Sequence, residues 1–202
     1  MKPLVIFALC ANAFGLDTSY ASWNAWLRKH TFVEGGASVV RYQDAKQNQE
    51  LNAVIKEFTE TDAATFGKLS ASDQLAFLIN AYNALAIKLV VDHYPIKSIK
   101  DVGSFWRSAG KQKFFKLFGK DASLDAIANE HIRKAFNDPR VHFALVPASK
   151  GGPNLRNEAY IGARLDRQLD EDATRFLKDP NKNRWDKKER TLTLSKVFDW
   201  YD

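Results

Sequence analysis

The chain has 202 residues, of which 45% are hydrophobic and 27% charged, a composition that excludes a disordered or low-complexity chain. Its formal net charge is +6, but Lys and Arg are interleaved with acids and aromatics, and no nucleic-acid-binding module is recognisable. A single Cys excludes an intrachain disulfide and a cysteine-rich zinc site, so packing must stabilise the fold.

Residues 1–13 have the pattern of a short secretory signal. Lys2 precedes an apolar stretch over residues 4–11, and the small residues Ala11 and Ala13 bracket a cleavage position. The stretch is too short to cross a bilayer, which takes about 20 apolar residues. The alternative is a buried first element of the domain. We expect cleavage after Ala13, which would remove Cys10 and leave a cysteine-free protein in the periplasm or outside the cell.

Two helices are predicted in the first third of the chain. Residues 17–30 place Trp23, Trp26 and Leu27 on one helical face, and a Gly35-Gly36 pair then breaks the pattern. Residues 47–58 also repeat apolar side chains at helical spacing. Each helix is therefore expected to pack one face against a core.

The strongest prediction is a central helix over residues 70–92. Ser70 followed three residues later by Asp73 is a helix-start pattern, and Pro95 marks the end. Apolar side chains occupy several faces in between, which indicates a largely buried helix. Asn80 and Asn83 lie three residues apart on one flank. Their amides need hydrogen-bond partners, because a buried unpaired polar group costs about 1–3 kcal/mol.

Shorter elements are predicted in the second half of the chain. After a turn at Gly103, residues 112–124 are expected to form a hairpin around Gly119, and Ser123 should start a helix that ends near Phe136. Residues 141–146 alternate side chains between two faces, which predicts an interior strand leading into loop 147–153. A polar helix is predicted over residues 157–178 and an edge strand over residues 191–194.

These elements mix strands and helices without regular alternation, which predicts the α+β class. No linker or repeat divides them, so residues 14–202 are expected to form a single compact domain. The domain should be helix-rich, with a small sheet packed on the central buried helix.

Several motifs follow one another along the chain: Ala76-Phe77-Leu78-Ile79-Asn80-Ala81-Tyr82-Asn83-Ala84-Leu85, His93-Tyr94-Pro95, Ser98-Ile99-Lys100-Asp101, Ser123-Leu124-Asp125, Asp138-Pro139-Arg140-Val141-His142-Phe143-Ala144-Leu145, Pro153-Asn154-Leu155, Ala159-Tyr160 and Leu194-Ser195-Lys196-Val197-Phe198-Asp199-Trp200-Tyr201. In this order they resemble the Domain of Unknown Function 547 family, over about residues 40–201. The family's biochemistry is unsettled, so the resemblance implies a domain rather than an activity.

The sequence departs from the family pattern at positions that bear on chemistry. In that pattern a His-Phe-Ala-Leu segment leads into a loop with two Cys, whereas Pro147 and Gly152 stand at those positions here. A Glu-His pair of the pattern is replaced by Ala128 and Asn129. The resemblance therefore implies that this chain lacks any thiol-based or metal-linked site that those residues form in relatives. A Cys–His hydrolase is excluded.

His142 and Ser149 are the candidates for catalytic residues. His142 could act as a general base oriented by Asn80 or Asn83; the alternative is a buried structural His. Ser149 could be a nucleophile beside Lys150, or it could belong to a plain turn. The loop lacks the spacing of a P-loop or of a Gly-x-Ser-x-Gly elbow.

Binding residues are expected around one cleft, between the flank of the central helix and residues 142–152. The candidates are Asn80, Asn83, Tyr82, Lys150 and Arg140. No cofactor is predicted. No metal site is predicted either, because the four His residues stand far apart and no two have the i, i+4 spacing of a metallohydrolase helix.

Three functions fit these features. The first is a secreted or periplasmic binding or scaffolding domain without thiol chemistry, whose partner is an anionic envelope component or another protein. The alternative is a metal-independent hydrolase of an envelope amide or ester, with His142 as base. The third is a basic surface that docks to anionic lipid or peptidoglycan without a cleft. No nucleic-acid partner and no transmembrane segment are predicted.

Overall fold

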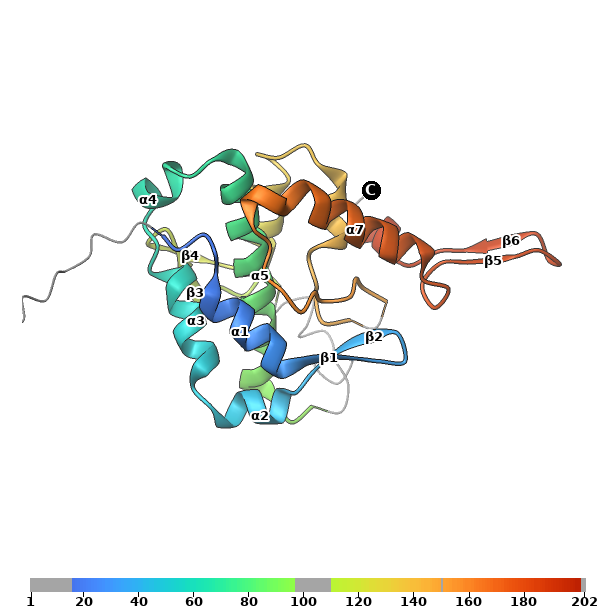
Figure 1. The fold of residues 1–202 in the computed structure, drawn as a ribbon, viewed down its shortest axis with the longest axis horizontal. Coiled ribbons are helices and arrows are strands. Elements are labelled where there is room, and N and C mark those ends of the chain that lie inside the picture. The colour runs from blue at the N-terminus through green and yellow to red at the C-terminus, as the bar shows by residue number, and fades with distance from the viewer. Residues whose placement is uncertain (1–15, 97–109, 150, 201–202) are drawn as a thin grey trace, which may run out of the picture.

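The computed structural model describes residues 16–96, 110–149 and 151–200 (Figure 1). The predicted signal segment, the predicted turn at Gly103 and the candidate binding residue Lys150 lie outside these ranges.

Helix α5 (Ala71–His93) runs through the middle of the molecule (Figure 1). Its start is capped as predicted, because Ser70 Oγ accepts a 3.1 Å hydrogen bond from the backbone N–H of Asp73. By length and composition α5 could cross a membrane, yet 89% of its most apolar stretch is buried inside the protein. The prediction of a central core helix is confirmed.

Four described helices precede α5: α1 (Ala21–His30), α2 (Tyr42–Gln47), α3 (Glu50–Thr59) and α4 (Ala63–Gly67). The helices predicted over residues 17–30 and 47–58 are confirmed as α1 and α3, whereas α2 and α4 were not expected. Trp23 and Leu27 of α1 are buried, and α2 and α3 pack directly on α5. Helices α2 and α3 thus bury apolar residues against the central helix, while α1 packs on α2 and α3.

The strands form three separate antiparallel hairpins in the described part of the chain. They are β1 (Thr31–Glu34) with β2 (Ala37–Val40), β3 (Phe115–Leu117) with β4 (Lys120–Ala122), and β5 (Arg184–Asp186) with β6 (Thr191–Thr193). The hairpin predicted around Gly119 is confirmed. The Gly35-Gly36 pair is the turn of the first hairpin, where both residues have positive φ, +57° and +81°. The α+β class is confirmed, with three small ribbons rather than one sheet.

The predicted strand over residues 141–146 is wrong. Pro139–Phe143 form a 3₁₀ helix, η2, whose first backbone N–H groups are capped by Asp138; its Oδ1 accepts a 3.0 Å bond from the N–H of Arg140. Proline at the first helical position has its φ already set for a helix. Val141, Ala144 and Leu145 are buried together, which is a helical spacing and not an alternating one.

The predicted helix over residues 157–178 begins later than expected. Helix α7 spans Leu165–Lys178 and follows a short 3₁₀ turn, η3 (Gly162–Arg164). Gly162 packs so closely on the start of α5 that a Cβ there would lie 2.1 Å from Asp73 Oδ1. This close approach leaves no room for a side chain at position 162, beside the N-terminus of α5.

Two short helices complete the fold. Ser123 Oγ accepts a 3.2 Å bond from the N–H of Ala126 and so starts the helix predicted there, observed as a π-helix, η1 (Ala126–Ile132). Helix α8 (Val197–Trp200) follows the third hairpin. Phe143 of η2, Phe176 of α7 and Phe198 of α8 pack together, with ring centroids 5.0–6.3 Å apart. This aromatic cluster attaches the C-terminal part to the body.

Candidate functional site

Asn83 joins α5 to the coil that follows η2. Its side chain is 2% exposed. Nδ2 donates a 3.0 Å hydrogen bond to the carbonyl of Ala144, and Oδ1 accepts a 2.9 Å bond from the N–H of Val146. One side-chain amide thus pairs with two backbone groups that would otherwise be buried without partners.

Asn80 makes the same arrangement with a different part of the chain. Its Nδ2 donates to the carbonyl of Tyr160 at 2.8 Å, and its Oδ1 accepts from the N–H of Tyr160 at 2.9 Å. The side chain is completely buried. The two predicted binding residues therefore face two different stretches of backbone, and each amide is engaged by them.

Other amides hold the same region from outside α5. We call residues 144–149 and 151–161 the docked coil. Gln168 of α7 donates to the carbonyl of Ala159 at 2.9 Å and accepts from the N–H of Ile161 at 3.0 Å. Asn154 donates to the carbonyl of Gly36 at 2.9 Å and accepts from the N–H of Ser38 at 3.2 Å. Side-chain amides thus do for the docked coil what strand partners do in a sheet.

His142 lies on η2, and Ser149 lies in the docked coil. Both are close in sequence to Ala144 and Val146, the two residues that Asn83 binds. His142 is half-buried, and burial, followed by the charge of Arg133, lowers the pKa of its imidazole below the usual range. Ser149 Oγ is buried without a hydrogen-bond partner among the described residues. A Cβ on Gly152 would lie 3.0 Å from that oxygen. The loop from Ser149 to Gly152 is therefore so tight that position 152 has little room for a side chain.

The other two described candidates have structural surroundings. Arg140 binds Asp138 at 2.7 Å, Asp166 at 2.8 Å and Asp170 at 2.6 Å, which ties η2 to α7. These hydrogen bonds raise the pKa of Arg140, and the bond to Asp138 has the largest effect. The same bond from Arg140 lowers the pKa of the Asp138 carboxyl. The Arg140 guanidinium is thus occupied by carboxylates. The other candidate, Tyr82, is buried on α5.

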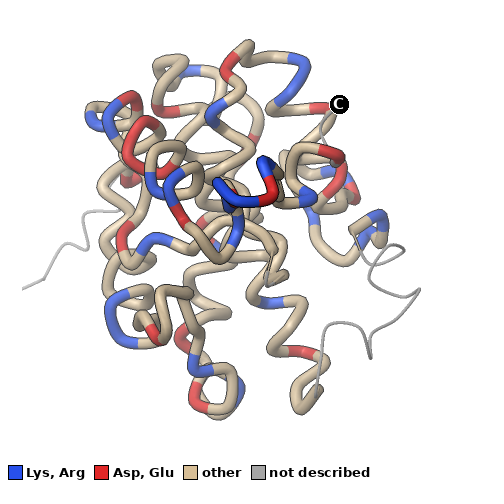
Figure 2. Tube along the Cα trace, turned by 90° about the vertical axis from the view of Figure 1, so that its right-hand side faces the viewer, with Lys and Arg blue, Asp and Glu red and all other residues tan. Residues whose placement is uncertain are grey.

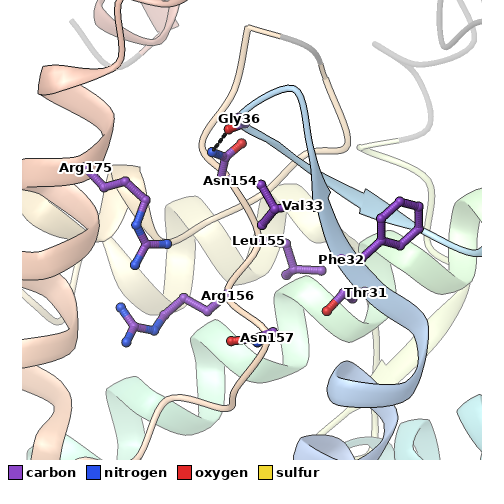
Figure 3. Close-up of a pocket in the computed structure, with 9 residues that line it drawn as sticks. All are labelled: Thr31, Phe32, Val33, Gly36, Asn154, Leu155, Arg156, Asn157 and Arg175. Carbon is purple, nitrogen blue, oxygen red and sulfur yellow. Dashed lines mark hydrogen bonds between the residues drawn. The ribbon is translucent and has the colours of Figure 1, made fainter.

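A cavity of about 330 Å³ opens between the first hairpin, the docked coil and α7 (Figure 3). Its lining consists of Thr31, Phe32, Val33, Gly36, Asn154, Leu155, Arg156, Asn157 and Arg175. The hydrogen bonds of Asn154 to Gly36 and Ser38 fix the hairpin against the coil, so one wall is preformed. The backbone N–H of Leu155 also donates to Ser38 Oγ at 2.8 Å.

Arg156 lies at the bottom of this cavity in a network of carboxylates. Its guanidinium bonds Glu158 at 2.5 Å, Glu171 at 2.8 Å and Asp172 at 3.1 Å, although its side chain is only 8% exposed. The Tyr160 hydroxyl donates to Asp172 at 2.6 Å. Burial raises the pKa of Asp172, against the opposing hydrogen bond from Tyr160 and the charge of Arg156. The Nε of Arg156 is buried and has no partner among the described residues.

Arg175 enters the same cavity from α7 (Figure 3). Its Nη1 lies 3.3 Å from Asp172, and its side chain is 47% exposed. Two guanidinium groups therefore approach one small space, one of them solvent-accessible. Guanidinium groups recognise carboxylate and phosphate oxygens through paired N–H donors. Among the described residues, no group of three or more His, Cys, Asp or Glu side chains is placed to hold a metal ion.

The sequence reasoning missed both arginines of this cavity. Asn154 and Leu155 belong to a motif that carries the family resemblance, and Arg156 directly follows it, which was the available signal. Arg175 gives no such signal, because its approach to Arg156 depends on how α7 packs on the docked coil. The first hairpin contributes through contacts such as Ser38 with Asn154, which are 116 residues apart.

Comparison with known proteins agrees with the motifs. A family model described as "Protein of unknown function, DUF547" matches residues 66–177, more than half of the chain. No curated protein and no solved structure matches. The matched residues contain α5, η2, the docked coil and nearly all of α7, which are the elements that carry both arginines and the amide-held backbone. The chain belongs to the DUF547 family.

Proposed function

We propose that this protein is a secreted or periplasmic, non-catalytic binding domain that holds an anionic group of an envelope component in the arginine cavity. The observation that carries the proposal is the pair Arg156 and Arg175, which extend into one cavity of about 330 Å³. The ligand group is a carboxylate or a phosphate, because these oxygens match guanidinium donors. The N-terminal signal pattern supports the compartment.

The charges around the cavity assign different tasks to the two arginines. Arg156 is surrounded by three carboxylates that use its Nη donors, and its Nε is buried, so it forms a fixed, charge-compensated wall of the cavity. Arg175 has one long contact with Asp172 and is half exposed, so it supplies the charge that a ligand meets first. The Asn157 side chain, also in the lining, adds a neutral donor.

Arg175→Gln is expected to weaken binding of an oxyanion by about tenfold or more, because a hydrogen bond to a charged group contributes about 1.5–3 kcal/mol. The measurement is a titration with inorganic phosphate and with a short acidic peptide, followed by amide chemical shifts or calorimetry. The matched control is Arg167→Gln, which removes the same charge from the same helix outside this cavity. Equal affinity in wild type and both variants would sink the proposal.

The hydrolase alternative rests on one observation, the lowered pKa of His142, which keeps the imidazole neutral and able to accept a proton at pH 7. If this reading holds, a screen of peptide and ester substrates should show activity that His142→Ala abolishes. Activity should also persist below pH 6.5, where an ordinary His is protonated. Activity that survives His142→Ala would remove His142 from the mechanism.

A further inference from the structure

The third hairpin carries an uncovered apolar face. Trp185 of β5 pairs in register with Leu192 of β6, so both side chains lie on the same face, and Leu194 continues that face two residues on. These three side chains are 49–56% exposed. Five of the seven large exposed hydrophobic side chains in the described residues belong to the C-terminal part: Leu177, Trp185, Leu192, Leu194 and Phe198.

The hairpin projects away from the body of the protein (Figure 1). Strands β5 and β6 pair only with each other. An isolated two-stranded hairpin is marginally stable in water, and it normally needs packing on one face. The face formed by Trp185, Leu192 and Leu194, which we call the hairpin face, is left about half exposed by the described chain. A surface outside the protein is therefore expected to cover it.

The charges around the hairpin face indicate what that surface is. Four basic residues lie in the hairpin and its turn: Arg184, Lys187, Lys188 and Arg190. The side chain of Lys182, just before it, is buried and paired with Asp179. The two acids in the same stretch are Asp186 and Glu189, and the Asp186 carboxylate is used in the turn, where it accepts from the N–H groups of Lys188 and Glu189. Figure 2 views the molecule from the side toward which the hairpin points. The projecting tip is therefore positively charged.

We propose that the β5–β6 hairpin docks the protein onto an anionic lipid bilayer. Trp185 and the two leucines would enter the interface between headgroups and acyl chains, where Trp is favoured, while the basic side chains meet the phosphate groups. A second copy of the chain is a poorer occupant, because two hairpins face to face would bring like charges together. The docking site is separate from the arginine cavity and does not depend on its ligand.

The test is co-sedimentation of the full chain with vesicles. Binding is expected to mixed phosphatidylglycerol–phosphatidylcholine vesicles and not to phosphatidylcholine alone. Trp185→Ala/Leu192→Ala should weaken it by about tenfold or more, since each loses a large apolar contact with the interface. Both side chains are exposed, so the double variant should still fold, which circular dichroism checks. The apolar stretch 4–11 is present in every variant, so differences between variants report the hairpin.

A charge-matched pair of variants separates a specific docking face from general basicity. Lys187→Gln/Lys188→Gln should weaken vesicle binding by about tenfold. Lys116→Gln/Lys120→Gln removes the same charge from the β3–β4 hairpin and should leave binding unchanged. Equal loss from both pairs, or equal binding of the Trp185→Ala/Leu192→Ala variant and wild type, would overturn the proposal. So would a dimer, seen by light scattering, that the same double variant dissociates.

Discussion

Asn83→Ala is expected to lower the free energy of unfolding by about 2–4 kcal/mol, because it leaves two buried backbone groups without partners at about 1–3 kcal/mol each. The groups are the carbonyl of Ala144 and the N–H of Val146. The side chain is 2% exposed, so bulk water cannot replace it freely. Denaturant-induced unfolding followed by circular dichroism gives the difference in midpoint.

Asn52→Ala is the matched control for this measurement. Asn52 is an exposed residue of α3 whose side chain bonds Gln49, the residue that precedes the helix. Ala is the better helix former, so the control should change stability by no more than about 0.5 kcal/mol. If the Asn83 variant unfolds at the same midpoint as the control, the amide does not hold the coil in solution.

Arg156→Met is expected to cost about 3–5 kcal/mol of unfolding free energy, because removing one partner of a buried ion pair leaves an uncompensated buried charge. Asp172, which is 3% exposed, would lose its main positive neighbour. Arg167→Met is the control: it breaks an ion pair with Glu171 in which the Arg side chain is 81% exposed, and such pairs contribute about 0–1 kcal/mol. Similar midpoints for the two variants would contradict a structural role for the network.

The same network predicts that Arg156→Met changes how the free energy of unfolding depends on pH in the acid range. Hydrogen bonds from Arg167 and then Arg156 lower the pKa of Glu171 from 4.5 to about 2. A carboxyl whose pKa is lowered on folding stabilises the fold above its unfolded pKa, and this contribution is lost as the pH falls through its folded pKa. Wild type should therefore lose stability between about pH 4.5 and 2, and Arg156→Met should lose less over that range.

Local signals were sufficient for the elements whose stabilising contacts are close in sequence. The start of α5 follows from Ser70 and Asp73, and the β3–β4 turn follows from Gly119, because in each case the partners are within a few residues. The strand predicted over residues 141–146 was wrong, although Asp138-Pro139 is a pattern that starts a helix. The prediction followed the alternation of apolar side chains, whereas the structure follows the cap that Asp138 provides to η2.

The site could be predicted only in part, because its contacts connect distant segments. The need of Asn80 and Asn83 for hydrogen-bond partners followed from their flank on a buried helix. That the partners are backbone groups of Tyr160, Ala144 and Val146 could not be read from spacing, since 61–80 residues separate them. The arginine cavity requires the first hairpin, the docked coil and α7 to be assembled first.

The closed loop around Gly152 limits which side chains position 152 can accept. A Cβ at position 152 would meet Ser149 Oγ at 3.0 Å and the Ser149 carbonyl oxygen at 3.3 Å, both closer than ordinary van der Waals contact. Position 147 is a Pro, which adds its own ring to the same contact. A side chain at position 152 therefore requires the Ser149 side chain and carbonyl to shift by a few tenths of an ångström. The loop therefore accepts a residue larger than Gly at position 152 only together with an adjustment of Ser149.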